Sequence, residues 1–537
     1  MQEVDGTRIP ELKNIVSESL QLARKLGASQ AESDVSLQKG LTTTVRLGEV
    51  ETVEYQRDRG MGITVYFGKR KGSASTADLS QRAVAETVEK ACDIARYTAE
   101  DDCSGLADPD ELARKLGAAQ AESDVSLQKG LTTTVRLGEV ETVEYQRDRG
   151  MGITVYFGQR KGSASTADLS PRAVAETVEK ACDIARYTAE DNCAGLADPE
   201  ELARDIPDLD LDHPWDLPPE QAVETARQCE AAGRKVDARI TNSEGASVSS
   251  HRGVRVYGNT HGFLEGYPST SHSVSCVLLA QTGDDMQRDY WYASARDARE
   301  LETSESIGRK AGERAVARLG ARKLATQRAR ILFAPEVARG FIGHFLGAVR
   351  GSSQYRKSSF LLDAAGQQVF PSFLKLSERP HIRKALGSSP FDGEGVATRN
   401  RELVSDGVLQ GYILGSYSAR KLGLKTTGNA GGTHNVLVES NTGGVDVGVL
   451  MRELGTGLLV TELMGQGANG VTGDYSRGAS GYWVENGALS FPVHEITIAG
   501  NLKDMYNNIA AIGSDVDVRG GVRVGSILVS EMMIAGE

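Results

Sequence analysis

A nearly identical tandem repeat constrains the fold of this chain more than any other feature of its sequence. Residues 22–114 recur as residues 112–204 at an offset of 90 residues. The two copies differ only at six pairs of positions, which are 29/119, 69/159, 81/171, 102/192, 104/194 and 110/200. Solenoid repeats diverge much further and recur every ~20 to 50 residues. The pattern therefore predicts one domain present twice, produced by a recent duplication inside the gene.

Each copy is predicted to form helices packed on an antiparallel sheet. Residues 10–26 carry apolar side chains at helical spacing, and polar–apolar alternation with glycine corners then predicts strands. Asp78 or Ser80 can cap a second helix, and the face of small apolar residues on this helix predicts that Cys92 is a core residue. In the second copy the first helix is shortened to residues 109–116. We expect one copy to dock on the rest of the chain and the other to form an appended or partly ordered domain.

The fold class expected for the whole chain is α+β. We place the first copy at residues 1–111, the second at 112–204, a proline- and aspartate-rich linker at 205–220, a middle α+β domain at 221–325 and a glycine-rich, mostly antiparallel β domain at 326–537.

The middle domain is predicted to hold two helices around a set of short strands. The helices cover residues 221–232 and 304–319, and the strands lie around residues 238–240, 253–257, 273–281 and 290–295.

The C-terminal domain is predicted to begin with a strand and a helix from Pro335 to about Val349. A polar loop follows, and after Asp363 we expect strands and glycine turns with one short helix near residues 445–454. Residues 458–504 alternate apolar runs with glycine corners, which is typical of antiparallel strands joined by tight turns. We interpret this stretch as the floor of a binding or active-site cleft.

Composition excludes several classes of partner. The formal net charge of -12 argues against nucleic acid, because phosphate binding needs clustered Lys and Arg. No apolar run approaches the ~18 residues of a membrane span, and the start of the chain is polar and acidic. The six cysteines form no C-x-x-C pair, so neither a zinc ribbon nor a redox motif is predicted. We expect a cytoplasmic protein with reduced, structural thiols.

No familiar catalytic motif is complete in this sequence. Residues 465–470 match G-x-G-x-x-G, but strand-forming residues follow where a dinucleotide site needs a helix. A zinc peptidase helix needs two histidines and a glutamate, and neither H-E-x-x-H nor H-E-x-x-x-H occurs. His494-Glu495 comes closest but lacks the second histidine. A Ser-His-Asp triad can assemble from distant positions, although no G-x-S-x-G elbow is present.

Several polar residues near the glycine-rich strands could line a cleft. His344 on the predicted helix is either a packing or cleft-lining residue or a catalytic one, and His434 in a glycine loop is either exposed or cleft-lining. Arg356 and Arg477 could hold a peptide carboxylate or an acidic side chain of a partner; alternatively, these charged loops pair internally with Asp474 or Glu485. The candidate cleft or peptide-contacting residues are His344, Tyr355, Arg356, Lys357, His434, Glu462, Asp474, Tyr475 and Arg477. We assign no catalytic or metal-binding residue.

Long segments of the chain resemble a known family. SYSARKLGLKTTGNAGGTHN, GTGLLVTELMGQGANGVTGDYSRGASGYWVENG, HEITIAGNLKDM and SSQYRKSSFLLD are similar to the PmbA (TldE) branch of the TldD/PmbA family. The resemblance covers the chain from the first helix to the end, with the duplication as an insertion.

The resemblance implies a cytoplasmic peptidase assembly in which PmbA-type and TldD-type subunits pair around a channel for small or unfolded peptides. TldD-type subunits carry H-E-x-x-x-H and zinc on the helix matching residues 335–349. The alignment, good to about one residue, puts Ile342, Gly343 and Gly347 at the three motif positions. The resemblance thus implies a heterodimer whose zinc lies in the partner, with no cofactor in this chain.

Two alternatives stay open. One is a self-sufficient peptidase with a different site, and the other is a peptide-binding or scaffolding protein without a peptidase role.

Overall fold

The computed structural model of the chain describes residues 9–26, 30–46, 49–67, 70–76, 78–97 and 109–536. These residues form two compact units. The first unit runs to residue 119 and includes pieces of the second copy at 151–155 and 162–186, whereas the second covers 120–150, 156–161 and 187–537. Helices and mainly antiparallel sheets build both, so the predicted α+β class is confirmed.

The first copy forms helices on a three-stranded antiparallel sheet. Its elements are α1 (Ile9–Lys25), β1 (Gln30–Arg46), β2 (Glu49–Phe67), β3 (Arg70–Thr76) and α2 (Gln81–Tyr97), with strand order β1-β2-β3. Met61, Ile63 and Val65 of β2 are buried in one cluster with α2. Cys92 lies in this cluster with no exposed surface, as predicted, and burial raises the pKa of its thiol. Cys103 lies outside the described residues.

The second copy repeats this order with a shortened first helix. Its elements are α3 (Pro109–Lys115), β4 (Gln120–Arg136), β5 (Glu139–Phe157), β6 (Arg160–Thr166) and α4 (Pro171–Tyr187). The 7 residues of α3 stand where α1 has 17, as the truncated sequence predicts. Leu137 and Gly138 join β4 to β5 with φ of 53° and 84°. Two positive φ angles define the hairpin turn that suits the twist of paired strands.

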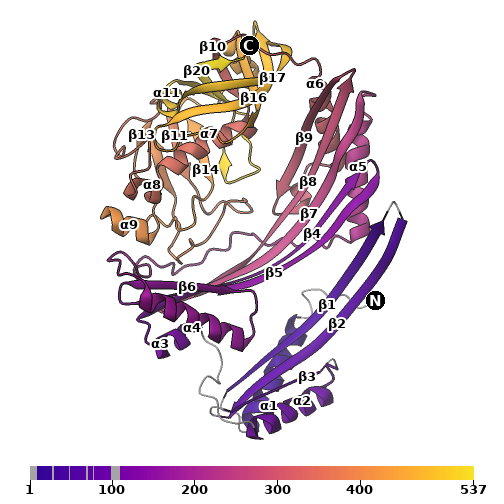
Figure 1. Cartoon of the computed structure of the whole chain (residues 1–537), viewed down its shortest axis with the longest axis vertical. Coiled ribbons are helices and arrows are strands. Elements are labelled where there is room, and N and C mark those ends of the chain that lie inside the picture. The colour runs from indigo at the N-terminus through magenta and orange to yellow at the C-terminus, as the bar shows by residue number, and fades with distance from the viewer. Residues whose placement is uncertain are drawn as a thin grey trace. The chain divides into compact units, whose positions relative to one another are not determined.

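The middle domain packs two helices on one face of a sheet of long strands. Its elements are α5 (Pro219–Arg234), β7 (Ile240–Asn259), β8 (Leu264–Thr282), β9 (Asp285–Ala295), the short 3-10 helix η2 (Ala298–Glu300) and α6 (Ser304–Ala317). Strands β4, β7, β8 and β9 are neighbours in that order, and α5 and α6 lie side by side over them (Figure 1). A Cβ on Gly308 of α6 would lie 1.8 Å from the carbonyl oxygen of Cys229, so glycine is required for this helix–helix approach.

Both middle helices confirm the sequence prediction, but the strands are much longer than predicted. The prediction of separate strands around 238–240 and 253–257 is wrong, because both fall in or beside the single strand β7. The polar centre of β7, around Ser249 and His251, is held by hydrogen-bonded neighbours on both sides. Cross-strand pairing, which is not local in sequence, overrides the weak local preference there.

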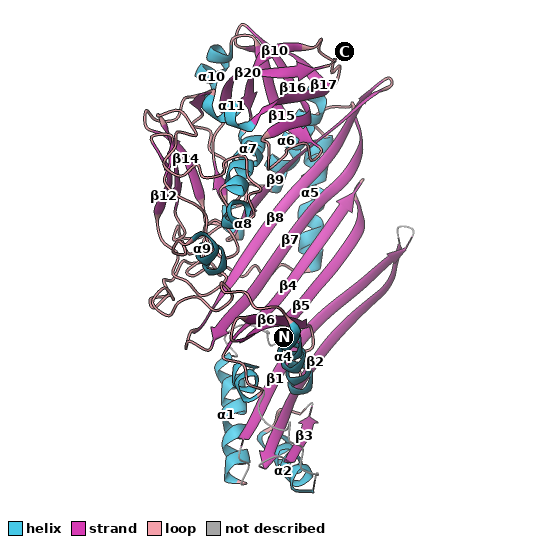
Figure 2. Ribbon diagram, turned by 60° about the vertical axis from the view of Figure 1, so that its left-hand side comes forward, coloured by secondary structure: helices cyan, strands magenta, loops and turns pink. Residues whose placement is uncertain are grey.

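The C-terminal domain contains two sheets around a large aromatic core. One sheet has the order β10-β15-β16-β17-β20-β18 with β10 also paired to β20, and the other has the order β13-β12-β11-β14-β19. The predicted antiparallel strands of residues 458–504 are present as β15, β16 and β17 (Figure 2). The strands of this domain are β10 (Gln327–Phe333), β11 (Leu374–Glu378), β12 (Arg401–Ser405), β13 (Val408–Leu409), β14 (Val436–Ser440), β15 (Gly457–Met464), β16 (Asp474–Glu485), β17 (Ala488–Asn501), β18 (Ile509–Ile512), β19 (Val522–Arg523) and β20 (Ile527–Ala535).

Helices of the C-terminal domain are more numerous than predicted. They are α7 (Pro335–Ala348), α8 (Gly351–Tyr355), α9 (Ser416–Leu422), α10 (Val447–Leu454) and α11 (Leu502–Asn507). The first and fourth confirm the prediction, whereas the expectation of only one helix after Asp363 is wrong. The predicted polar loop after α7 is also wrong in part, because it begins with α8. These additional helices are one or two turns long, too short to show a helical period in the sequence.

The segment between the second copy and the middle domain is packed rather than extended into solvent. Leu209 and Leu211 are buried, and the amide of Lys384 donates to the carbonyl of Leu209. Leu209 therefore ties this segment to the C-terminal domain, and Leu211, whose carbonyl accepts from the Thr270 amide of β8, ties it to the middle domain.

None of the helices in the described ranges is both long and apolar enough to cross a lipid bilayer.

Candidate functional site

Helix α7 presents two very different faces. Phe341, Ile342 and Phe345 are fully or almost fully buried in the C-terminal core. On the other face, a Cβ added at Gly340, Gly343 or Gly347 would meet no atom within 4 Å. Residues three or four positions apart share a helix face, so these glycines leave a strip of bare backbone facing open space.

Beside this strip, α7 and strand β16 bring together three of the predicted residues, His344, Tyr475 and Arg477. The rings of His344 and Tyr475 meet edge to face with centroids 5.9 Å apart. Buried atoms of two of these side chains, His344 Nε2 and Arg477 Nε, have no hydrogen-bond partner in the described structure, and the Arg477 guanidinium lies against the Tyr475 hydroxyl, whose pKa it lowers. Buried polar groups are nearly always paired, so this cluster (the α7–β16 cluster) is unusual and suited to a ligand.

The electrostatics of the α7–β16 cluster favour a neutral histidine beside a cation. Burial, and then the positive charge of Arg477, lower the pKa of His344. Burial raises the pKa of Tyr475 to about 12. At neutral pH the cluster therefore holds an uncharged imidazole, an uncharged phenol and a guanidinium. Such groups can donate hydrogen bonds to a carboxylate or a carbonyl oxygen.

Removal of the Arg477 charge is expected to raise the pKa of His344. In the variant Arg477→Gln, the second cause of the lowered pKa disappears while burial remains. Deuterium exchange at the imidazole C2 position, followed by mass spectrometry across a pH series, measures this pKa residue by residue. Arg328→Gln is the matched control, because Arg328 pairs with Glu531 on the surface. An unchanged His344 pKa in Arg477→Gln would contradict the proposed proximity of the two side chains.

Asp474 and Glu485, the suggested internal partners, bond to other residues than Arg477. Asp474 accepts hydrogen bonds from the hydroxyl of Thr472 at 2.7 Å and from Asn501 Nδ2 at 3.3 Å. Glu485 accepts from the hydroxyl of Ser490 at 2.9 Å. The carboxylate of Asp474 therefore shapes its own turn.

The residues Tyr355, Arg356 and Lys357 make their contacts elsewhere. Tyr355 ends α8 and meets the ring of Tyr417 on α9 edge to face, with centroids 5.8 Å apart. Arg356 lies over the ring of Tyr355 and donates to its hydroxyl, and Lys357 has a φ of 54°. These three residues form a separate surface corner whose contacts run toward α9.

Glu462 belongs to an ion-pair network between domains. Its carboxylate pairs with Arg318 of α6 at 2.5 Å, and Arg318 also pairs with Asp289 of β9. Arg314 joins Asp289 to Glu336 at the start of α7. This network connects α6 and β9 to β15 and α7, so Glu462 has a structural role that the sequence does not reveal.

His434 sits in a loop that a buried carboxylate organises. Glu378 on β11, 2 % exposed, accepts from the His434 amide at 2.6 Å and from Asn429 Nδ2 at 2.8 Å. Burial lowers the pKa of His434, while the charge of Glu378 and hydrogen bonds with the backbone at Gly387 and Gly428 act in the opposite direction. The interpretation as an exposed loop histidine is therefore wrong. Sequence analysis missed Glu378, because a glutamate in a short strand shows no local sign of distant partners.

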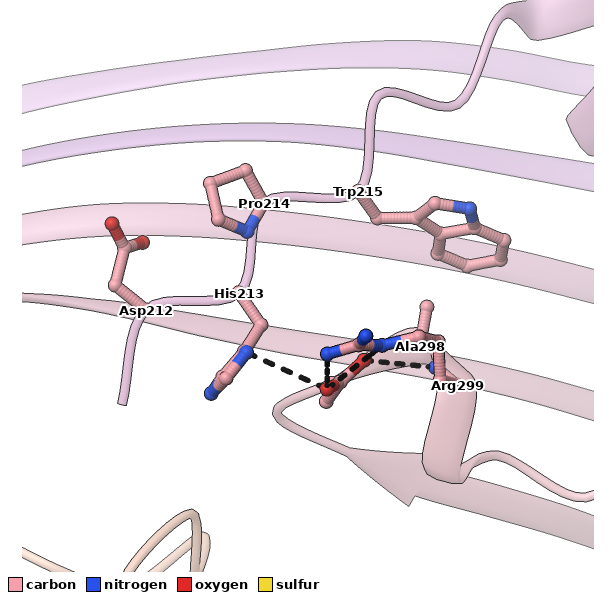
Figure 3. A pocket seen from close by; sticks show the side chains of 7 residues that line it. Asp212, His213, Pro214, Trp215, Ala298 and Arg299 are labelled. Carbon is pink, nitrogen blue, oxygen red and sulfur yellow. Dashed lines mark hydrogen bonds and ion pairs between the residues drawn. The ribbon is translucent and has the colours of Figure 1, made fainter. Parts of the chain in front are cut away.

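A small cavity lies where the segment before α5 meets η2 (Figure 3). It measures about 440 Å³ and is lined by Asp212, His213, Pro214, Trp215, Asp297, Ala298 and Arg299. The Asp297 carboxylate forms ion pairs with Arg299 Nη2 at 2.7 Å and with Lys384 Nζ at 3.1 Å. These hydrogen-bonded pairs hold the pKa of Asp297 below its usual range. Since the charges are already matched, the cavity is better explained as a structural ion network than as a substrate site.

The residues of α7 do not fit a catalytic zinc ion. Ile342, the residue that the resemblance places at the first motif histidine, is buried in the core, whereas the glycines of α7 face open space. A register one residue later puts Gly343 and His344 at the first two motif positions and Ala348 at the last. Either register supplies at most one imidazole, whereas a zinc peptidase site needs three protein ligands. In the described part of the chain, no three His, Cys, Asp or Glu side chains are grouped to hold a metal.

Family models match most of the chain. The PmbA/TldA metallopeptidase C-terminal domain matches residues 326–536 and the central domain matches residues 212–319. Domain 1 of the same family matches twice, at residues 34–95 and 124–185, which agrees with the duplication.

Named relatives agree with these models. Metalloprotease PmbA of Escherichia coli O157:H7 is 53% identical over 417 residues, which cover 78% of this chain and 92% of that protein. A PmbA homolog of Haemophilus influenzae is 50% identical over 427 residues, covering 79% and 94%.

Among solved structures, a Bacteroides thetaiotaomicron protein described as a candidate modulator of DNA gyrase superposes with a TM-score of 0.75 at 28% identity, covering 80% of this chain and 97% of that one. TldE of Thermococcus kodakarensis shares the fold, with a TM-score of 0.70 at 19% identity over 80% and 99% of the two chains. The chain therefore belongs to the PmbA/TldA metallopeptidase family, with its first domain present in duplicate.

Proposed function

We propose that this chain is the PmbA/TldE-type subunit of a cytoplasmic peptidase that degrades small or unfolded peptides together with a TldD-type subunit. In this proposal the zinc belongs to the partner, and this chain has no metal centre of its own. The observation that carries the proposal is the outer face of α7, where Gly340, Gly343 and Gly347 surround a single histidine. The reduced thiols of the described cysteines fit the cytoplasm.

The role we assign to this chain is to grip extended peptide. The bare backbone of α7 admits a peptide closely, because no side chain stands in the way. Arg477 and Tyr475 would donate to a peptide carboxylate or carbonyl, and neutral His344 can donate or accept. A charge-assisted hydrogen bond contributes about 1.5–3 kcal/mol, so the cluster supplies enough energy to hold one end of a substrate.

The test compares each chain alone with the two chains together. We expect this chain to contain no stoichiometric zinc by elemental analysis and to leave an unstructured fluorogenic peptide intact. Mixing with a TldD-type chain is expected to give a stable complex and peptide cleavage. One zinc per purified chain, or cleavage by this chain alone that disappears in His344→Ala, would establish a self-sufficient peptidase instead. A complex whose turnover equals that of the partner alone would establish a scaffolding role.

The peptide-gripping role has its own test in the active complex. Arg477→Ala is expected to lower kcat/KM about 10- to 100-fold, mainly through KM, because one charge-assisted hydrogen bond is lost. Arg328→Ala provides the matched loss of a surface arginine and should leave kcat/KM unchanged. Equal kinetics for the two variants would remove the α7–β16 cluster from the substrate path.

A further inference from the structure

Strand β4 of the second copy pairs with β7 of the middle domain. The sequence of β4 occurs again in the first copy, as β1. The antiparallel pairing of β4 with β7 runs without a break from Glu122↔Asn259 to Val135↔Ala246. Strands β1 and β4 have the identical sequence QAESDVSLQKGLTTTVR. None of the six positions that differ between the copies lies in this strand. Every contact of β4 with β7 therefore has an exact counterpart available in β1.

Side-chain contacts join β4 to β7 at several positions. The hydroxyl of Tyr257 donates to Glu122 at 2.8 Å, and Arg255 Nε donates to Asp124 at 2.7 Å. The hydroxyls of Thr134 and Ser247 lie 2.9 Å apart. At offset 90 the first copy supplies Glu32, Asp34 and Thr44 for the same partners.

Two further features of the docking strand also recur in the first copy. Gly130 faces His251, and a Cβ there would lie 2.2 Å from the imidazole Nδ1; the first copy has Gly40 at this place. The buried carboxylate of Glu230 on α5 accepts from the amides of Leu137 and Gly138, both at 2.6 Å, and the first copy repeats this Leu-Gly pair. The fit of a glycine against His251 and the binding of the Leu-Gly turn by Glu230 are therefore available to both copies.

In the described residues of the first copy, β1 is an edge strand. It pairs with β2, and the sheet order is β1-β2-β3. A long edge strand presents a row of backbone donors and acceptors that can pair with another strand. Among the described strands, β7 is its best matched partner, because β7 already pairs with the identical sequence in β4.

We propose that β1 and β4 compete for β7 within one chain, so that the protein has two docking states that differ in which copy completes the middle domain. The strand contacts are equal in the two states. With the first copy docked, the second copy becomes a looped-out insertion, and closing that loop has an entropic cost. The state with the second copy docked is therefore the more populated one, and damage to β4 shifts the population toward the first copy.

Disulfide reporters can count the two states. Ser247→Cys combined with Thr134→Cys reports docking of the second copy, and Ser247→Cys with Thr44→Cys reports docking of the first. Facing residues of antiparallel strands lie within the Cα spacing that a disulfide needs. Val135, fully buried in the middle-domain core, is changed to Asp to disfavour the second copy. We expect Val135→Asp to increase the monomeric Thr44→Cys/Ser247→Cys disulfide at least tenfold.

The matched control is Val45→Asp, which should abolish the first-copy disulfide and leave the second-copy disulfide unchanged. A near-UV circular dichroism spectrum confirms that each variant keeps its tertiary structure, and the double variant Val45→Asp/Val135→Asp should be markedly less stable than either single variant. The proposal is overturned if the first-copy disulfide stays absent in Val135→Asp, if it forms only in dimers, or if Val135→Asp alone is as unstable as the double variant.

Discussion

Replacing Glu378 by alanine is expected to destabilise the C-terminal domain by about 3–5 kcal/mol, the usual cost of breaking a buried ion pair from one side. The Glu378 side chain is 3% exposed and pairs with Arg401 Nε at 2.8 Å. Arg401 Nη2 already lacks a partner, so the substitution leaves a guanidinium with one remaining hydrogen bond, to the carbonyl of Tyr412. The His434 loop loses its anchor in the same step.

Urea unfolding followed by tryptophan fluorescence measures this loss as a lower midpoint. Glu402→Ala is the matched control, because Glu402 on the adjacent strand pairs with Arg379 and Lys375 while its side chain is 35% exposed. Exposed ion pairs contribute about 0–1 kcal/mol, so the control should change the midpoint little. If the two variants unfold at the same urea concentration, Glu378 is not the anchor that its hydrogen bonds indicate.

Tyr506→Ala is expected to lower the free energy of unfolding by about 3–5 kcal/mol, because it opens a cavity in the aromatic core. Tyr506 is fully buried, and its ring centroid lies 4.7 Å from that of Phe341 and 5.0 Å from that of Phe370. Its hydroxyl donates to the carbonyl of Phe341 at 2.9 Å. This residue therefore fixes the core side of α7 and, through it, the direction of the glycine face.

Tyr506→Phe separates the two contributions of this side chain. It keeps the ring and loses only the hydrogen bond, so it should cost about 1 kcal/mol. Thermal unfolding of both variants gives the comparison. Under the proposed function, Tyr506→Ala should also weaken peptide binding by the complex with a TldD-type subunit, because α7 loses support. If Phe and Ala variants have the same melting temperature, the ring does not support α7 as the geometry implies.

Local patterns were sufficient for the longer helices of this chain. Pro335 and the apolar spacing behind it predicted α7 to within a residue at its end. The short helices α8, α9 and α11 escaped prediction, because one or two turns carry too few apolar residues to define a period. The length of β7 escaped for a different reason, since its polar centre is stabilised by strands that are distant in sequence.

The candidate site was predictable only as a set of separate residues. His344, Tyr475 and Arg477 were predicted from the sequence as members of one larger set that also included Tyr355 and Arg356. The fold unites the first three through contact between α7 and β16, and it directs Tyr355 toward Tyr417. Pairing across a core depends on tertiary packing, which no spacing rule in the sequence records.

The sequence by itself determined the duplication and the lack of a two-histidine motif on α7, because both are properties of residues close together along the chain. Only the tertiary structure decided which copy docks on β7 and which polar atoms are buried without partners. The two docking strands are identical, so their sequences hold no information that could choose between them. The choice lies in the connection of the chain and in contacts between segments that folding alone brings together.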